Sequence, residues 1–151
     1  MERAVARIDA GAVERNCAHL DATVGEGVEL CAVVKADGYG HGADACATAA
    51  LAGGATRLAV ATGGEAAQIG RRFPHVPLLT MGALTEQELD MALAAGSEVA
   101  VWHEEFRAMA SGRARAQGRP APGADPRHRL GRGRGRPRRR GCRAGPYRCR
   151  A

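Results

Sequence analysis

The sequence lacks any apolar run long enough to cross a membrane. A membrane-spanning helix needs about 18 to 20 consecutive apolar residues, and no stretch of the 151 residues approaches that length. Residues 1–11 also lack the apolar core of a secretory signal peptide. We therefore expect a cytoplasmic protein without membrane contact.

Paired cysteine motifs are absent as well. The five cysteines lie at positions 17, 31, 46, 142 and 149, so no two of them have the spacing of a CxxC motif or a zinc-ligand pair. Free thiols in a reducing cytoplasm are the expected state of such cysteines. No metal site is predicted, because four histidines also lack metal-ligand partners at useful spacing: His19, His75, His103 and His128.

Charge is divided unevenly along the chain. Residues 1–112 contain eight basic and fifteen acidic side chains, a net charge of −7, whereas residues 113–151 contain fourteen arginines and one acidic residue, a net charge of +13. The overall charge of +6 and the pI near 9.6 therefore come from the C-terminal part alone. They predict nothing about the partners of the acidic part.

The C-terminal part also lacks the residues that build a core. Residues 113–151 contain no Val, Ile, Met, Phe or Trp and consist mostly of Arg, Gly, Pro and Ala. We expect disorder, because this composition cannot bury enough apolar surface to offset the entropy lost on ordering. The Arg-Gly repeats of residues 131–136 are typical of segments that bind nucleic acid through phosphates. With Tyr147 as the only aromatic residue nearby, such binding is predicted to be nonspecific.

Helical and strand patterns alternate along residues 1–112. Apolar residues at helical spacing predict helices, and short continuous apolar runs predict strands buried on both faces. The predicted helices are residues 9–24 (with Asp9 as the cap), 43–52, 64–72, 85–95 and a last helix through Phe106 and Met109. The predicted strands are residues 30–34, 58–61, 77–81 and 98–102.

This alternation indicates an α/β fold with a parallel sheet and right-handed crossovers. Both a doubly wound sheet and a (β/α)8 barrel have this order of elements. A complete barrel needs eight strand–helix units and about 250 residues. The patterned part of this chain holds only about half of that number of units, so the α/β pattern breaks off before it closes.

The residues that carry chemistry are gathered in the stretch VVKADGYGHG, residues 33–42. Lys35 directly follows the first predicted strand, and α/β folds place their active sites at the carboxyl ends of strands. An amine among apolar neighbours loses hydration, and the neutral amine is the form that attacks an aldehyde to give a Schiff base. Tyr39 offers a hydroxyl to a phosphate oxygen. On these residues alone, a lysine that only extends into solvent before a glycine turn is the preferred interpretation.

This stretch resembles the signature of the alanine racemase family, in which the first barrel strand ends in Lys-Ala-Asp/Asn-x-Tyr-Gly-His-Gly. The order before it agrees: an Arg-Ile-Asp opening strand at residues 7–9, then a helix containing Asn16. Later features agree with the family's N-terminal barrel, including Glu65-Ala66 and the apolar runs at 58–61 and 77–79.

The resemblance covers roughly residues 1–121. It implies an incomplete (β/α)8 TIM-type barrel of about four to five βα units. Residues 122–151 then form the disordered, Arg/Gly/Pro-rich basic tail.

Two site residues are implied at positions that match the signature. Lys35 would hold pyridoxal 5'-phosphate (PLP) covalently and act as one of two proton-transfer bases, and Tyr39 would bind the cofactor phosphate. PLP supplies the electron sink for the carbanion left when the α-proton is removed. The family reaction interconverts L- and D-alanine and supplies D-alanine for peptidoglycan. His41 is left out of the catalytic set, because a histidine in a glycine turn more often has a structural role.

Parts of the family's site have no counterpart in this chain. The second base is a tyrosine of the C-terminal β-domain, contributed by the partner subunit of the homodimer. Later barrel strands supply an arginine that faces the pyridine nitrogen and further phosphate contacts. Tyr147 lies in the basic tail and does not match. We therefore expect an N-terminal fragment that is inactive alone, and the family's selectivity among amino acids lies in the missing half.

Two alternatives to a racemase stay open at this point. One is a PLP-binding barrel protein without the β-domain. The other is a non-catalytic remnant whose basic tail binds polyanions nonspecifically. The Tyr-Gly-His-Gly run of residues 39–42 favours the racemase.

The sequence departs from the family pattern near residue 121. Family members continue with an apolar strand and Asp-Thr-Gly, whereas this chain continues Gly123-Ala124-Asp125. Read one base later, the codons of residues 123–129 permit an apolar strand followed by Asp-Thr-Gly. Our hypothesis is a one-base frameshift near residues 121–123, and resequencing that finds the displayed frame intact would defeat it.

Overall fold

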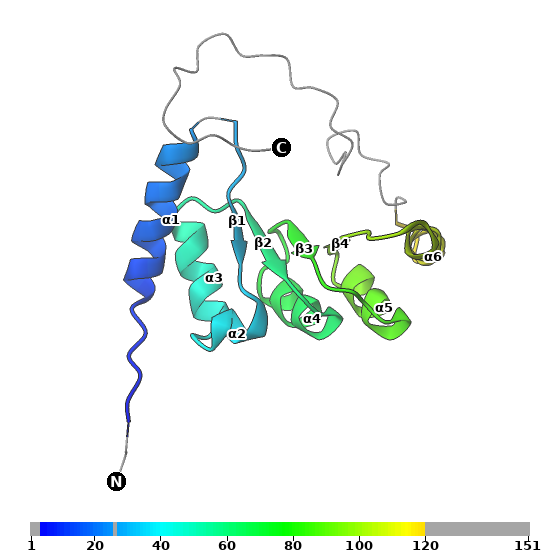
Figure 1. The fold of residues 1–151 in the computed structure, drawn as a ribbon, viewed down its shortest axis with the longest axis horizontal. Coiled ribbons are helices and arrows are strands. Elements are labelled where there is room, and N and C mark those ends of the chain that lie inside the picture. Colours follow the sequence, from blue (N-terminus) through cyan, green and yellow to red (C-terminus); the bar gives the residue numbers. More distant parts are fainter. Residues whose placement is uncertain (1–3, 26, 120–151) are drawn as a thin grey trace.

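The computed structural model describes residues 4–25 and 27–119 (Figure 1). Helices and strands alternate along them in this order: α1 (Ala10–Val24), β1 (Cys31–Val33), α2 (Lys35–Tyr39), α3 (Ala43–Ala52), β2 (Arg57–Val60), α4 (Gly63–Arg72), β3 (Leu78–Thr80), α5 (Glu86–Ala94), β4 (Glu98–Val99) and α6 (Glu104–Ala116). The basic tail, the domain boundary at 121 and the frameshift hypothesis concern residues outside the described ones.

The order of the strands decides between the two α/β architectures. All neighbouring strands are parallel, and the sheet order is β1-β2-β3-β4, the order of the sequence. A doubly wound sheet reverses its strand order and carries helices on both faces. Successive right-handed crossovers in one direction instead place every connecting helix on one face, and α3 packs on α4 as α4 packs on α5 (Figure 1). The four strands therefore form an arc of a (β/α)8 barrel, which confirms the predicted class.

The helices begin where the sequence supplies caps. Asp9 accepts a hydrogen bond from the Ala12 amide at the start of α1. The predicted capping box of Thr85 and Glu88 opens α5, and Thr62 and Glu65 form a second box at the start of α4. Each box satisfies two N–H groups at the start of a helix that have no backbone carbonyl partner within the helix.

The core lies between the sheet and its helices. Alternate strand residues such as Leu58 and Val60 are completely buried against α4 and α5, where Ile69 and Leu89 meet them. The opposite face of the sheet is the inside of the barrel arc, and there Val33 is 37% exposed. The expectation that the first strand is buried on both faces is therefore wrong, because four strands curve around one side of the interior only.

An ion pair crosses this inner face. Arg57 of β2 donates two hydrogen bonds to the Glu98 carboxylate of β4, at 2.7 and 3.1 Å, and so spans β3. The hydrogen bond to Glu98 raises the pKa of the Arg57 guanidinium more than partial burial lowers it. The interior of such a barrel is usually filled by branched apolar side chains, whereas here a charged pair occupies part of the inner face of the sheet.

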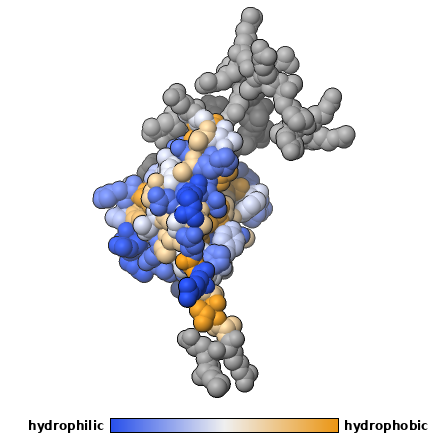
Figure 2. Space-filling view, turned by 90° about the vertical axis from the view of Figure 1, so that its left-hand side faces the viewer, coloured by the Kyte–Doolittle hydropathy of each residue, from blue (hydrophilic) through white to orange (hydrophobic). Residues whose placement is uncertain are grey.

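Helix α1 has the predicted span, but none of its residues is buried. Leu20 and Val24 on its apolar stripe are 50% and 42% exposed. The helix packs mainly on α3 and on Gly53 at its end, where a Cβ would lie 2.3 Å from the carbonyl oxygen of Glu14. Figure 2, which views the molecule from this side, accordingly shows apolar and hydrophilic residues mixed on the surface.

Two predicted strands also differ from the structure. Residues 7–9 form no strand, since no described strand lies alongside them, and Ile8 is 45% exposed. The strand expected over 98–102 ends at Val99, and Trp102 beyond it is 66% exposed. β4 pairs with β3 alone, so the ladder ends where β3 ends.

The two edges of this arc predict self-association. The outer sides of β1 and β4 carry backbone groups that pair with no described strand, and the inner face exposes apolar side chains beside them. Static light scattering of the 151-residue chain is expected to show an apparent mass that rises with concentration. Val33→Lys, which adds a charge at the β1 edge, is expected to weaken that rise. A concentration-independent monomer mass for the wild type would contradict the prediction.

Candidate active site at the end of the first strand

Lys35 lies at the carboxyl edge of the sheet. The ladder between β1 and β2 continues past Val33, because the Val34 amide donates to the Ala59 carbonyl oxygen at 2.8 Å. Lys35 is the next residue, is half-buried and is the only lysine in the chain. The structure thus places the predicted catalytic lysine at the edge where barrel enzymes carry their active sites.

The glycine turn after Lys35 is a left-handed helical turn. Residues 36–40 all have positive φ, and three of them are not glycine: Ala36 (50°), Asp37 (52°) and Tyr39 (58°). The Gly40 amide donates to the Ala36 carbonyl at 2.9 Å, which closes the turn. Left-handed backbone costs about 1–2 kcal/mol for each such residue. The sequence predicted a turn but not this conformation, since alanine and tyrosine give no signal of it.

Contacts with α3 hold the far end of the turn. The Asp37 carboxylate accepts a hydrogen bond from the Ala43 amide at 2.8 Å, at the start of α3. Gly38 is buried, and a Cβ there would lie 3.1 Å from the Cys46 sulfur and 3.2 Å from the Ala43 nitrogen. The absence of a side chain at Gly38 therefore allows the turn to lie directly on α3.

Tyr39 lies beside Lys35. The Lys35 Nζ is 6.0 Å from the centre of the Tyr39 ring, a distance at which a cation and an aromatic ring attract each other. Tyr39 is 59% exposed, so its hydroxyl is open to a ligand. The structure thus brings the two predicted cofactor residues together, one amine and one phenol on the same turn.

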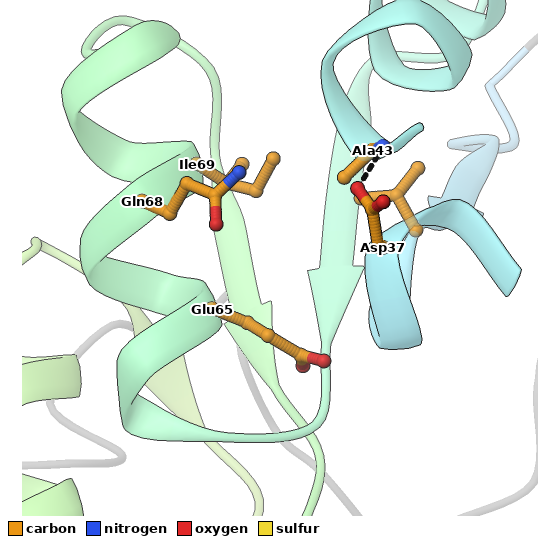
Figure 3. A pocket seen from close by; sticks show the side chains of 6 residues that line it. Asp37, Ala43, Glu65, Gln68 and Ile69 are labelled. Atoms are coloured by element: carbon orange, nitrogen blue, oxygen red, sulfur yellow. Dashed lines mark hydrogen bonds between the residues drawn. The ribbon is translucent and has the colours of Figure 1, made fainter. Parts of the chain in front are cut away.

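Glu65 is a site residue that the sequence analysis did not single out for a role. Its Oε1 accepts a hydrogen bond from the Ala36 amide at 2.7 Å, and its Oε2 accepts from the Ala61 and Thr62 amides at 2.8 and 3.1 Å. Figure 3 shows this side chain extending from α4 toward the side on which Asp37 of α2 lies. The pattern Thr62-x-x-Glu65 indicates a capping box, but it gives no sign of the contact with Ala36, 29 residues away.

These hydrogen bonds predict a pH dependence. Partial burial raises the pKa of the Glu65 carboxyl, but the hydrogen bonds from Ala61, Ala36 and Thr62 together lower it by more. The resulting pKa lies below the ordinary value of 4.5. A lowered pKa in the folded state means that the carboxylate stabilises the fold above about pH 4.5, and that this contribution is lost as the pH falls through the folded-state pKa.

Urea unfolding of the wild type and of Glu65→Gln measures this effect. The difference in free energy of unfolding between the two proteins is expected to be larger at pH 7 than at pH 3.5. At pH 3.5 the wild-type Glu65 side chain is increasingly protonated, so it loses the advantage of its negative charge. An equal difference at both pH values would contradict the assignment.

A cavity of about 300 Å³ lies behind the turn, on the helix side of the sheet. It is lined by Val34, Asp37, Ala43, Glu65, Gln68 and Ile69 (Figure 3). Lys35 and Tyr39 do not line it, so it is separate from the surface where the amine and the phenol meet.

Other candidate groups add nothing to this site. His41 is exposed, and its backbone amide donates to the Gly38 carbonyl at 3.1 Å within the turn. Within residues 4–25 and 27–119, the His, Cys, Asp and Glu side chains form no cluster that could hold a metal ion. Within the same ranges, no helix combines the length and the apolar character that a membrane crossing requires.

Comparison with known proteins places this chain in a family. A model of the alanine racemase N-terminal domain matches residues 8–123, most of the chain. The chain belongs to the alanine racemase family. The alanine racemase of Desulforamulus reducens is 43% identical over 88 residues, which are 58% of this chain and 24% of that protein.

Solved alanine racemases share the fold. The enzyme of Streptomyces coelicolor superposes with a TM-score of 0.67 at 37% identity, over 76% of this chain and 30% of that one. The enzyme of Bacillus anthracis, solved with bound L-Ala-P, gives a TM-score of 0.63 at 32% identity, over 70% of this chain and 27% of that one. The chain therefore spans about a quarter of the length of the alanine racemases that it matches.

Proposed function

We propose that this chain supplies the cofactor-binding lysine of a PLP-dependent alanine racemase, which interconverts L- and D-alanine and so provides D-alanine for peptidoglycan. The observation that carries the proposal is the position of Lys35 at the carboxyl end of β1, beside Tyr39 on a left-handed turn. Relatives with this N-terminal domain are named alanine racemases. A cytoplasmic location belongs to the same proposal and is supported by the free thiols of Cys17, Cys31 and Cys46.

The residues at this edge fit PLP. An aldehyde needs a nucleophilic amine, and Lys35 is the chain's only lysine and is half-buried at the sheet edge. A phosphate needs hydrogen-bond donors, and the exposed Tyr39 hydroxyl lies on the same turn. When bound, PLP supplies an electron sink that stabilises the negative charge left by loss of an α-proton.

Each residue has a separate task in this proposal. Lys35 would hold the cofactor covalently through Nζ, and once the amino group of the substrate has displaced it, the freed amine would accept the α-proton or return it. Tyr39 donates its hydroxyl hydrogen to the phosphate and so orients the cofactor. The turn between them sets the distance from the amine to the phenol. An alanine-like substrate agrees with the L-Ala-P bound to the Bacillus anthracis relative.

Racemisation needs a second base on the opposite side of the α-carbon from Lys35. We propose that this base comes from the part of the alanine racemase chain that lies outside the region matched here, and that a homodimer completes the site. The 151-residue chain alone is therefore proposed to bind the cofactor without racemising alanine.

Covalent uptake of PLP tests the proposal. The purified chain is incubated with PLP, reduced with borohydride and digested, and the modified peptide is identified by mass spectrometry. The expected result is one adduct at Lys35, distinguished from the N-terminal amine by its peptide. Modification of the N-terminus alone would overturn the proposal.

Tyr39→Phe is expected to weaken PLP binding without removing the covalent bond. The change deletes one hydroxyl and leaves the ring beside Lys35 in place, so the dissociation constant is expected to rise about tenfold, the value of one hydrogen bond to a charged group. Titration of the visible absorbance of the bound cofactor measures it. Pyridoxal, which lacks the phosphate, serves as the control: its affinity is expected to be the same for both proteins.

A further inference from the structure

One carboxylate joins the carboxyl ends of two strands. Glu65 lies on α4, near the end of β2, and caps its own helix through Thr62. Its other oxygen reaches the turn that follows β1 and accepts the Ala36 amide hydrogen at 2.7 Å. The second capping box of the fold provides a comparison: Glu88 accepts hydrogen bonds from Thr85 alone among the described residues. The hydrogen bond from Ala36 to Glu65 at the sheet edge is therefore not required for capping the helix.

The hydrogen bond to Glu65 is made by the peptide group that directly follows Lys35. The amide of Ala36 belongs to the bond between Lys35 and Ala36, where the chain leaves the strand and enters the left-handed turn. Strained backbone persists only where surrounding contacts determine it. The far end of the turn is held by Asp37 on the Ala43 amide, and the near end is held by Glu65.

We infer that Glu65 is a positioning residue for the lysine site, acting through the Ala36 amide to fix the direction of Lys35 and its distance from Tyr39. The inference rests on the proposed function insofar as the positioned amine binds PLP. Glu65 needs no contact with the cofactor for this. It sets the conformation of the turn, and the turn sets the 6.0 Å between the Lys35 Nζ and the Tyr39 ring.

Only a carboxylate of this length satisfies the three amides. The N–H groups of Ala36, Ala61 and Thr62 converge on two acceptor oxygens. A glutamine offers one oxygen, and its NH2 group would face an amide that is also a donor. An aspartate keeps the negative charge at the start of α4 but is one methylene shorter, so it cannot reach the Thr62 and Ala36 amides together.

The test compares Glu65→Gln with the matched variant Glu88→Gln in the 151-residue chain. Both substitutions weaken a capping box, so urea unfolding is expected to show a loss of stability in both, larger in Glu65→Gln because it also weakens the bonds to Ala36 and Ala61. Amide hydrogen exchange at Ala36 is expected to accelerate about tenfold or more in Glu65→Gln and to stay within about twofold of the wild type in Glu88→Gln.

The spectroscopic readout follows the cofactor. At equal PLP concentration, the visible band of PLP bound at Lys35 is expected to lose intensity in Glu65→Gln, with a dissociation constant raised about tenfold. Glu88→Gln is expected to leave the band unchanged. A wild-type rate at Ala36 and wild-type PLP affinity in Glu65→Gln would overturn the inference, and so would equal effects of the two variants.

Glu65→Asp keeps the test decisive if the glutamine variant folds poorly. It retains the helix-start charge and is expected to accelerate Ala36 exchange as Glu65→Gln does; a wild-type rate would overturn the inference. The exchange arm also separates the two proposals. A wild type that protects Ala36 but takes up no PLP at Lys35 would overturn the proposed function and leave the Glu65 contact established.

Discussion

Replacing Lys35 by alanine is expected to abolish covalent retention of PLP. No other lysine can substitute for it, since Lys35 is the only one in the chain. After borohydride reduction, intact-mass analysis is expected to show the adduct in the wild type and none in Lys35→Ala apart from any at the N-terminal amine. The free energy of unfolding is expected to change by less than about 0.5 kcal/mol, because a half-buried side chain without a buried partner contributes little to stability.

Lys35→Arg is the informative control for this result. Arginine keeps a positive charge beside Tyr39 but remains protonated and cannot attack an aldehyde. Weak, reversible PLP binding with no borohydride-stable product is therefore expected. Equal adduct yields in the wild type, Lys35→Ala and Lys35→Arg would show that the amine at the end of β1 is not the reacting group.

Gly63→Ala is expected to produce the largest loss of stability of any small substitution at a helix contact. A Cβ at Gly63 would lie 2.2 Å from the Glu88 carbonyl oxygen and 2.7 Å from its Cα, so α4 and α5 would have to move apart. Overpacking of this kind costs about 1–3 kcal/mol, and we expect the upper end because the obstacle is backbone. Urea unfolding measures the change.

The neighbouring glycine supplies the matched control. A Cβ at Gly64 has only the Thr62 hydroxyl oxygen within contact distance, at 4.0 Å. Gly64→Ala is therefore expected to stabilise the helix by up to about 1 kcal/mol, the difference in helix propensity. Similar effects at both positions would mean that α4 and α5 are not packed as closely as the structure has them.

The sequence predicted the order of elements and the lysine site but not how the site is held. Apolar periodicity predicts α3 and β2 closely, because burial against the helices dictates those residues directly. Apolar periodicity does not indicate strand order, so the patterns alone left the barrel and the doubly wound sheet open; the family resemblance predicted the barrel, and the strand order confirms it. The left-handed residue Ala36 also donates its amide hydrogen to Glu65, 29 residues away, and no local pattern in the sequence indicates that contact.

The exposed faces were missed for a related reason. An apolar stripe such as that of α1 shows that a residue can be buried, not that a neighbour is present to bury it. Leu20 and Val33 are large apolar residues of the kind found in cores, yet both are exposed to solvent. Periodicity reports the preference of one element, whereas burial depends on how many other elements surround it.

The sequential strand order has a consequence for synthesis on the ribosome. Each strand pairs with the next one to emerge, and α3, α4 and α5 each pack on the following helix, so the pairing of each described strand can form as soon as the next strand has been made. Nascent chains that add structure unit by unit in this way have low contact order and close only short loops. Residues 31–60 therefore contain a parallel strand pair and its covering helix as soon as β2 has left the exit tunnel.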